Sequence, residues 1–308
     1  MKKKTILVTC SLIALFCFIN SYVQKKDKPK ISFSFDDGSI RDFPNHKNSD
    51  WNQQLLKNLK KNELKAILYV KGSGLDNKKG EAIIKSWNES GHLIGNHTYS
   101  HPNYNKTSFK QFKREFLKND SLINTYSNYT KLFRFPYLKE GNTIQKRDDF
   151  RAFLKTEKYK IGHVTIDASD WYVDSRLTKK LKENPTADIS GFKQYYIQHL
   201  FERAQYYDSL SVDLTGRQIN HNLLLHHNLS ASLFLDDLIQ HFKNQGWEVV
   251  DVDKAYRDEF YKQVPQTIPA GESLVWALAK LSGKYEFILR YPAESGQYEK
   301  EKMDNLGL

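Results

Sequence analysis

The sequence ISFSFDDG, residues 31–38, places an apolar strand directly before two adjacent carboxylates and a glycine. The apolar run 31–35 predicts a strand that is buried in a sheet. Asp36 and Asp37 are an unexpected end for such a strand, because neighbouring carboxylates repel each other and are costly to bury. An Asp-Gly pair is also a common turn signal. The rest of the chain therefore has to show whether this pair serves chemistry or only a turn.

Strand-like and helix-like segments alternate after residue 30. The apolar runs that predict strands cover residues 31–35, 66–70, 93–96, 132–135, 163–166, 223–225 and 248–252. Helical periodicity between them covers residues 51–62, 80–90, 108–126, 143–158, 189–209 and 232–244. Three glycines stand where left-handed helix caps are expected, namely Gly91, Gly162 and Gly246. This alternation predicts an α/β fold, a (β/α) barrel of about seven parallel strands with its active site at the C-terminal ends of the strands.

The first 22 residues have the pattern of a targeting segment. Three lysines at positions 2–4 precede the apolar run 5–20, and the charged stretch QKKDKPK follows at residues 24–30. We expect a signal peptide or membrane anchor over residues 1–22 and a linker over residues 23–29. Lipidation at Cys17 is a further alternative. The protein is therefore expected to be exported, to the periplasm, the cell surface or the extracellular space, with membrane contact only through this segment if it stays uncleaved.

The remainder of the chain divides into a catalytic domain and a tail. We assign residues 30–255 to the catalytic domain and residues 256–308 to an extension that packs on the barrel, with a helix within 265–280 and a strand over 284–291. Both cysteines, Cys10 and Cys17, lie in the targeting segment. Any metal in the catalytic domain therefore has to be held by histidine and carboxylate side chains.

The formal net charge of the chain is +11. The lysines are dispersed through the helical segments with acids between them, which is typical of a solvated basic surface. A weak attraction to anionic envelope polymers is the alternative. A nucleic-acid-binding protein would need basic and aromatic residues clustered on one surface. The sequence shows no such cluster, so we expect no nucleic acid among the partners.

Polar residues with catalytic potential follow the predicted strands directly. Asp36 and Asp37 follow the first strand, and later strands are followed in turn by His97 and His101, by Arg134 and Tyr137, by Asp167, Asp170 and Trp171, and by His226 and His227. The C-terminal ends of parallel barrel strands meet at one rim. Residues that are nearly 200 positions apart are therefore expected to lie close together.

Asp37, His97 and His101 form a set of two histidines and one carboxylate. Two histidines four positions apart, on one helical turn or in a tight loop, can direct both imidazoles at one point. Three protein ligands with open coordination positions are typical of a catalytic metal rather than a structural one. One carboxylate of the pair would then bind a divalent cation, while Asp36 remains beside it as a base.

Five short strings occur in order along the chain: SFDDG from residue 34, HTYSHP from 97, RFPY from 134, DASDW from 167 and LLLHH from 223. Together they resemble the five sequence blocks of the NodB-homology polysaccharide deacetylases, carbohydrate esterase family 4, over residues 30–255. The resemblance implies a distorted (β/α) barrel that removes acetyl groups from N-acetylated or O-acetylated glycans. It also implies a divalent metal, most often Zn²⁺, with Co²⁺ or another divalent ion left open.

The resemblance implies a catalytic role for four of the matching residues. Asp36 would be the general base, and Arg134 would hold its carboxylate by charge-assisted hydrogen bonds. His226 would be the general acid that protonates the leaving group. Asp170 would orient and tune this histidine, with Asp167 as the alternative partner.

Two further matching residues would contact the substrate. Trp171 would form a wall of the groove, and Tyr137 and its neighbouring backbone would lie near an oxyanion site. The chain departs from the family pattern at Phe135 and Leu138, where a proline or small residue and a glycine are common. It also has His227 where an aspartate often follows the acid, and we expect this histidine at the surface or in the groove.

The sequence therefore predicts an exported, metal-dependent polysaccharide deacetylase that hydrolyses N-acetyl groups of a glycan and releases acetate. Peptidoglycan, chitin-type oligomers and envelope polysaccharides remain open as the acetylated partner, and a monomer is expected. An O-acetyl polysaccharide esterase with the same mechanism is one alternative. A catalytically inactive glycan-binding barrel is the other, although the base, the ligands and the acid are all present in the sequence.

Overall fold

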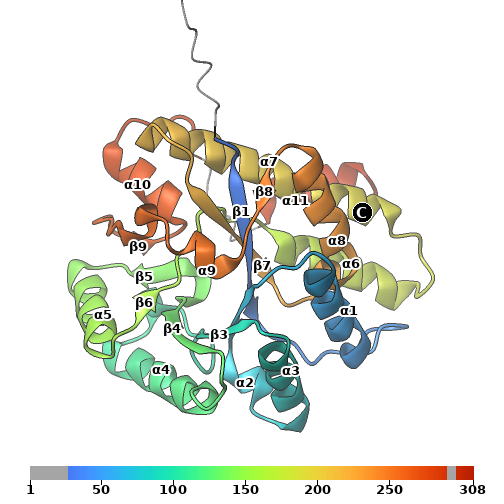
Figure 1. Cartoon of the computed structure of the whole chain (residues 1–308), viewed down its shortest axis with the longest axis horizontal. Coiled ribbons are helices and arrows are strands. Elements are labelled where there is room, and N and C mark those ends of the chain that lie inside the picture. Colours follow the sequence, from blue (N-terminus) through green and yellow to red (C-terminus); the bar gives the residue numbers. More distant parts are fainter. Residues whose placement is uncertain (1–26, 290–295) are drawn as a thin grey trace, which may run out of the picture.

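Strand β1 (Lys30–Asp37), which contains the quoted sequence, lies at the centre of the fold (Figure 1). The structure is a computed structural model that describes residues 27–289 and 296–308. The predicted targeting segment 1–22 lies outside the described residues. Among these described residues, no helix is both long enough and apolar enough to cross a membrane.

Seven parallel strands form the main sheet, in the order β6-β4-β3-β2-β1-β7 with β8 also paired to β1. The predicted α/β barrel of about seven parallel strands is confirmed. Besides β1, its strands are β2 (Ile67–Val70), β3 (Leu93–Asn96), β4 (Tyr129–Phe133), β6 (Lys160–Ile161), β7 (Asn220–His226) and β8 (Glu248–Val249). A second, antiparallel sheet was not predicted and consists of β5 (Lys139–Gly141) and β9 (Ala270–Gly271).

An irregular segment completes the barrel. After β6, the backbone N–H of Gly162 still donates to β4, at 2.6 Å, whereas that of Ile166 donates to Asn222 O in β7, at 3.1 Å. Ile166 and Leu223 then form a single isolated parallel bridge. The prediction of a strand over 163–166 is wrong. This segment leaves β4 after Gly162 and reaches β7 at Ile166, so it forms no regular ladder with either strand.

Helices surround the sheet (Figure 1). They are α1 (Asn48–Lys61), α2 (Gly72–Leu75), α3 (Lys78–Glu89), α4 (Phe109–Ile123), α5 (Ile144–Thr156), α6 (Asp170–Glu183), α7 (Ser190–Thr215), α8 (Leu229–Asn244), α9 (Val252–Ala255), α10 (Leu274–Ser282) and α11 (Gln297–Asn305). Short 3₁₀ turns are η1 (Tyr104–Lys106), η2 (Pro136–Leu138) and η3 (Glu259–Lys262). Side-chain oxygens that accept backbone N–H groups begin several of these helices, as Asn77 does for α3 and Asn228 for α8.

All six predicted helices of the barrel are present with shifted ends, whereas α2, α6, α9 and α11 were not predicted. Gly91 and Gly246 have the expected positive φ, at 82° and 83°. Gly162 does not, because Lys158 already takes the left-handed position after α5 with a φ of 60°. The predicted strand over 284–291 is also wrong for residues 284–289, which form a turn whose backbone hydrogen bonds are local.

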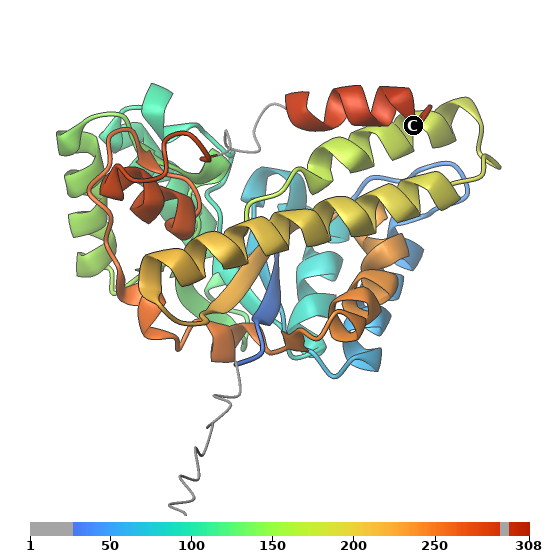
Figure 2. The same ribbon diagram turned by 90° about the horizontal axis from the view of Figure 1, so that it is seen from above.

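The extension after residue 255 shares the main hydrophobic core with the barrel strands. Phe260, Leu274, Tyr285 and Met303 belong to the same cluster of buried residues as β1. Figure 2 shows α11 alongside α6. An ion pair between Arg176 of α6 and Asp304 of α11, at 2.7 Å, joins the two helices.

The two faces of β1 have different chemistry. Side chains alternate between the faces of a strand, and Phe33 and Phe35 belong to the hydrophobic cluster. Ser32, Ser34 and Asp36 occupy the opposite positions and are also buried. Both serines make hydrogen bonds to residues of β7 within this buried face. The barrel interior beside β1 is therefore polar, and it leads towards Asp36 at the rim.

Gly162 provides a test of the irregular closure. A Cβ atom at this position would lie 2.0 Å from the hydroxyl oxygen of Tyr69, which is buried and hydrogen-bonded to the hydroxyl of Tyr256 at 2.9 Å. We therefore expect Gly162→Ala to lower the free energy of unfolding by about 1–3 kcal/mol, measured by urea denaturation. Gly74→Ala is the control, because its Cβ would meet only Lys71 Cε at 4.0 Å. Equal stability of the two variants would contradict the tight packing at Gly162.

Candidate metal centre and catalytic site

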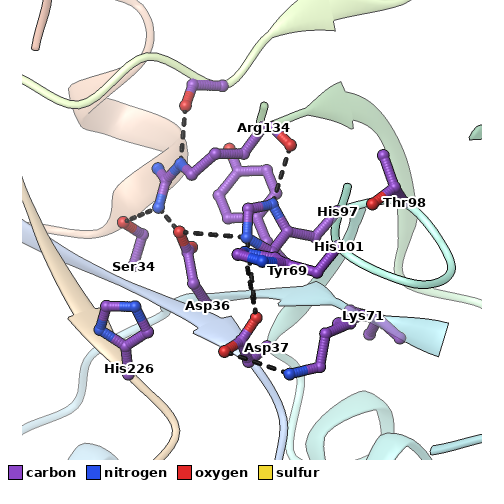
Figure 3. A network of polar contacts seen from close by, with 12 residues as sticks. Ser34, Asp36, Asp37, Tyr69, Lys71, His97, Thr98, His101, Arg134 and His226 are labelled. Carbon is purple, nitrogen blue, oxygen red and sulfur yellow. Dashed lines mark hydrogen bonds and ion pairs between the residues drawn. The ribbon is translucent and has the colours of Figure 1, made fainter. Parts of the chain in front are cut away.

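A cavity of about 410 Å³ opens at the C-terminal ends of the strands. Its lining includes most of the residues singled out in the sequence, namely Asp36, Asp37, His97, His101, Tyr137, Asp167, Trp171 and His226. Arg134 and Asp170 are buried beside this lining and contact it through Asp36 and His226 respectively. Figure 3 shows Asp36 between Arg134, the two metal-site histidines and His226.

Asp37, His97 and His101 converge as a metal site requires. The Nε2 atoms of His97 and His101 lie 3.8 Å and 3.6 Å from Asp37 Oδ1. One ligand atom from each residue lies within 4.8 Å of the other two. Ligand atoms of a tetrahedral zinc, each about 2.1 Å from the ion, are about 3.4 Å apart. The three side chains therefore fit a cation at their centre with small adjustments.

The hydrogen bonds of this cluster leave its ligand atoms available. His97 Nδ1 lies 2.8 Å from Arg134 O, and because a carbonyl oxygen only accepts, Nδ1 carries the hydrogen. Its Nε2 lone pair then faces Asp37, which is the arrangement usual for a metal-ligating histidine. Asp37 Oδ1 is buried and accepts no hydrogen bond from any described residue. A bound cation would be a suitable partner for this oxygen.

The electrostatics of the cluster match a cation site. Burial lowers the pKa of His97 to about 4 and, together with the neighbouring His97, lowers that of His101 to about 3, so both imidazoles are neutral and able to bind a metal. Burial alone would raise the pKa of Asp37, but the two histidines, which are protonated in the acidic range where this carboxyl group titrates, and Lys71 hold it below its ordinary value. Lys71 Nζ lies 3.4 Å from Asp37 Oδ2.

The backbone around the site is strained. Asp37, Thr98, His101, Tyr137 and Leu138 all have a positive φ, between 55° and 75°. Residues other than glycine adopt this left-handed conformation at a cost, and such residues gather at functional sites. At Asp37 the conformation ends the regular alternation of β1, so that Asp37 turns to the histidines. The two histidines meet across a tight loop rather than on a helical turn.

Asp36 forms a buried ion pair with Arg134. Arg134 Nη1 donates to Asp36 Oδ1 at 2.6 Å, and the two side chains are 1% and 4% exposed. Burial raises the pKa of Asp36, and Arg134 opposes part of that rise without cancelling it. The other oxygen, Oδ2, lies 3.7 Å from His97 Nε2. Asp36 is therefore beside the metal cluster, fixed in place and more basic than an ordinary aspartate.

The guanidinium of Arg134 has further partners inside the barrel. It donates to Ser34 Oγ at 2.8 Å, to Gly162 O at 2.9 Å and to the hydroxyl oxygen of Tyr256 at 3.1 Å. Its central carbon lies 4.0 Å from the centroid of the Tyr69 ring. The irregular segment after β6 thus leaves the carbonyl oxygen of Gly162 available to Arg134, whereas a regular strand would have used it for sheet pairing.

His226 forms the second charged pair of the site. Its Nδ1 donates to Asp170 Oδ1 at 2.7 Å, and its backbone N–H donates to Asp170 Oδ2 at 2.8 Å. Asn228 Nδ2 also donates to that oxygen at 3.0 Å. Burial alone would lower the pKa of His226, but Asp170 outweighs it and raises the pKa to about 9. Of the two aspartates considered in the sequence, Asp170 makes this contact and Asp167 lines the cavity.

The two expected substrate residues lie at the cavity wall. Tyr137 is 49% exposed, and its ring lies 4.5 Å from that of His101 between centroids. Trp171 lines the same cavity from the first turn of α6. Both residues thus offer aromatic surface to the cavity that contains Asp37, His97 and His101.

His227 is neither at the surface nor in the groove, so that expectation was wrong. It is 2% exposed. Its Nδ1 accepts from Ser39 N at 2.9 Å, and its Nε2 donates to Asn52 Oδ1 at 2.9 Å. It also packs against Trp51. His227 therefore follows the acid in sequence but connects the loop after β1 to helix α1.

Two charged residues of the cavity lining were missed in the sequence. Lys71 directly follows β2, and the rule that site residues follow strand ends would have found it. Glu272 lines the cavity from the extension, immediately after β9. No signal in the sequence indicated Glu272, because β9 is two residues long and pairs outside the main sheet.

Comparison with known proteins matches part of the chain to a family. Residues 23–151 match the family described as polysaccharide deacetylase. This part of the chain is similar to polysaccharide deacetylases. The resemblance is thereby confirmed over the matched residues, which include the blocks that begin at residues 34, 97 and 134.

Individual polysaccharide deacetylases are similar to the chain at low identity. A peptidoglycan-N-acetylglucosamine deacetylase of Bacillus cereus is 27% identical over 146 residues, which are 47% of each chain. A peptidoglycan-N-acetylmuramic acid deacetylase, PdaA of Bacillus subtilis, is 23% identical over 235 residues, 76% of this chain and 77% of that protein. The chain spans less than half the length of the first curated relatives that it matches.

A solved structure supports the same fold. The crystal structure of a peptidoglycan N-acetylglucosamine deacetylase superposes with a TM-score of 0.52 and 20% identity. The alignment covers 75% of this chain and 89% of that one. The two proteins therefore share the barrel fold.

The metal cluster can be tested without any substrate. We expect Asp37→Ala to weaken zinc binding by more than about 100-fold, because it removes one of three ligands and leaves two neutral imidazoles. Titration of metal-free protein with Zn²⁺ by calorimetry measures this. Asp50→Ala, an exposed carboxylate of α1, is the control and should bind zinc as the unaltered protein does. Unchanged zinc affinity in Asp37→Ala would exclude Asp37 as a ligand.

Proposed function

We propose that the protein is an exported, metal-dependent deacetylase that hydrolyses N-acetyl groups of a glycan and releases acetate. The observation that carries this proposal is the arrangement within one cavity of a ligand cluster, a basic carboxylate and a protonated imidazole. Asp37 and the two histidines form the cluster, Asp36 is the carboxylate and His226 is the imidazole. These are the groups that hydrolysis of an unactivated amide needs.

Asp37, His97 and His101 would hold the divalent cation. Zn²⁺ is the best match, because two neutral imidazoles and one carboxylate with open positions are a typical catalytic zinc set. Co²⁺ or another divalent ion would accept the same ligands. When bound, the cation supplies a Lewis acid that activates water and polarises the acetyl carbonyl.

Asp36 acts as the general base in this proposal. Its carboxylate lies beside the cluster, with Oδ2 3.7 Å from His97 Nε2, and burial raises its pKa. A raised pKa makes the carboxylate a better proton acceptor, and Arg134 keeps it ionised and oriented. Asp36 therefore takes the proton of the attacking water.

His226 acts as the general acid. Its pKa of about 9 keeps the imidazole protonated at neutral pH, and the Nδ1 bond to Asp170 leaves Nε2 to deliver the proton. An amide needs this proton more than an activated ester does, because the departing amine is a poor leaving group. Arg134 beside the base and Asp170 beside the acid thus keep the two groups in opposite protonation states.

Tyr137 and Trp171 would position the sugar. Both line the cavity, and aromatic faces suit the apolar faces of sugar rings. The left-handed backbone at Tyr137 and Leu138 places this loop against the ligand His101, where neighbouring backbone N–H groups could serve a developing oxyanion. The relatives act by name on peptidoglycan, which supports an envelope glycan as the substrate.

An acetate-release assay tests the proposed function. We expect the zinc-loaded protein to release acetate from N-acetylated peptidoglycan or chitotetraose, with Co²⁺ as a substitute and loss of release in a chelator. Asp36→Asn should keep its zinc and lose at least about 100-fold in rate, since a general base contributes that much. Asp50→Asn is the matched control.

Other outcomes of this assay would change the proposal. Release only from an O-acetylated polysaccharide would make the protein an esterase. No release from any glycan by zinc-loaded protein would favour the inactive glycan-binding barrel. Full activity in Asp36→Asn would reject Asp36 as the base.

The pH dependence of kcat tests His226 as the general acid. The imidazole of His226 must be protonated to act, so kcat on an N-acetyl substrate should fall as the pH rises through about 9. Asp170→Asn removes the charge that raises this pKa, so its alkaline limb should move to lower pH. Glu183→Gln, an exposed change at the end of the same helix, should leave the limb in place. A common alkaline limb in all three proteins would contradict the role of His226.

A further inference from the structure

The extension after residue 255 reaches the catalytic cavity. Its strand β9 pairs antiparallel with β5, and β5 directly follows the Tyr137–Leu138 loop in the chain. The backbone N–H of Glu272 donates to Leu138 O at 2.8 Å. A Cβ atom on Gly271 would lie 1.9 Å from that same oxygen, so only glycine permits this approach. The extension and the loop beside His101 are therefore in direct backbone contact.

Both ends of this part of the extension are fixed to the barrel. We name residues 265–274 the C-terminal strap. At its start, Arg151 Nη1 donates to Pro265 O at 3.0 Å and Arg147 Nη1 donates to Gln266 O at 2.9 Å, both from α5. At its end, the N–H of Leu274 donates to Val164 O at 2.8 Å. The strap thus spans from α5 to the irregular closure of the barrel.

The strap stabilises a loop that is strained by itself. Tyr137 and Leu138 have φ values of 56° and 55°, and neither is a glycine. A conformation of this kind persists where the surroundings hold it. The hydrogen bond from Glu272 N to Leu138 O is one such restraint, and the ring of Tyr137 lies against His101. The strap therefore acts on the loop that lies beside the metal cluster.

Glu272 also contributes its side chain to the cavity wall. Its carboxylate forms an ion pair with Lys139 of β5, and the side chains are only 9% and 13% exposed. A carboxylate accepts hydrogen bonds and donates none when ionised. Sugar hydroxyl groups are donors, so a fixed carboxylate at the wall of a glycan site has a natural partner. Lys139 lowers the cost of keeping this charge in a confined cavity.

We propose that the C-terminal strap is part of the substrate site, in which Glu272 accepts a hydrogen bond from a hydroxyl group of the glycan. The backbone of the strap meanwhile holds the Tyr137–Leu138 loop against His101. This inference rests on the proposed function for the identity of the ligand as a glycan. It assigns a binding role to residues outside the five sequence blocks.

Binding without turnover tests this assignment independently of deacetylation. Zinc-loaded protein in the Asp36→Asn background is titrated calorimetrically with tetra-N-acetylchitotetraose. We expect Glu272→Gln to raise the Kd about tenfold, as the loss of a hydrogen bond to a charged acceptor does. Glu286→Gln is the matched control, because Glu286 is an exposed carboxylate of the extension that pairs with Lys280 at 2.7 Å. The control should bind the probe with unchanged affinity.

Lys139→Gln separates sugar binding from a purely structural ion pair. This variant breaks the same pair but keeps the carboxylate, so it should weaken probe binding less than Glu272→Gln does. Zinc stoichiometry should remain one per chain in both variants. Equal losses of probe affinity in the two variants would show that the Glu272–Lys139 pair is only a structural contact, and this would overturn the proposal. A loss of bound zinc together with the probe affinity would do the same.

Two further readouts complete the test. In the active background, Glu272→Gln should raise KM by a larger factor than it lowers kcat, and an equal effect on both would count against a binding role.

Should Glu272→Gln fail to fold, Glu272→Asp replaces it, since the shorter side chain keeps the negative charge near Lys139 and withdraws it from the cavity. Wild-type affinity in Glu272→Asp would then overturn the proposal. Absence of acetate release from the unaltered protein would instead concern the proposed function alone.

Discussion

The buried guanidinium of Arg134 is the group on which the rest of the structure depends. A charge that is 1% exposed is tolerable only if it is paired and its hydrogen bonds are satisfied. Asp36 supplies the opposite charge, Ser34 of the same strand supplies an acceptor, and Gly162 and Tyr256 supply acceptors from two other parts of the chain. The carboxylate proposed as the base is therefore also a structural partner, so its position cannot drift without exposing or orphaning the arginine.

This pairing explains the two adjacent aspartates of ISFSFDDG. The alternation of side chains along β1 directs the Asp36 carboxylate into the polar interior, where Arg134 compensates its charge. The positive φ of 75° at Asp37 breaks the alternation and turns the second carboxylate to the histidines. Repulsion between two neighbouring charges is thus relieved by giving each a different partner. The strand is buried, and both carboxylates at its end are accommodated.

Much of the fold and of the cavity could be predicted from the sequence because both follow from strand periodicity. A parallel barrel brings strand ends to one rim, and this rule placed Asp37, His97 and His226 together although they are far apart in the chain. The rule failed where local pattern does not record tertiary contact. Residues 163–166 look like a strand, yet Gly162 and Ile166 bond to different neighbours. Nothing in the sequence shows that His227 is buried.

The pairing of β1 has a consequence for the order in which the protein folds. Its Ser32 accepts a hydrogen bond from Asn222, which is 190 positions further along the chain. Contacts of such long sequence separation close late and slow folding. Strand β1, the first to be made, has no complete set of neighbours until β7 and β8 are available, because it pairs with both. The proposed active centre is consequently among the last parts of the molecule to assemble, and a chain interrupted before residue 220 would carry its proposed metal ligands without a barrel to hold them.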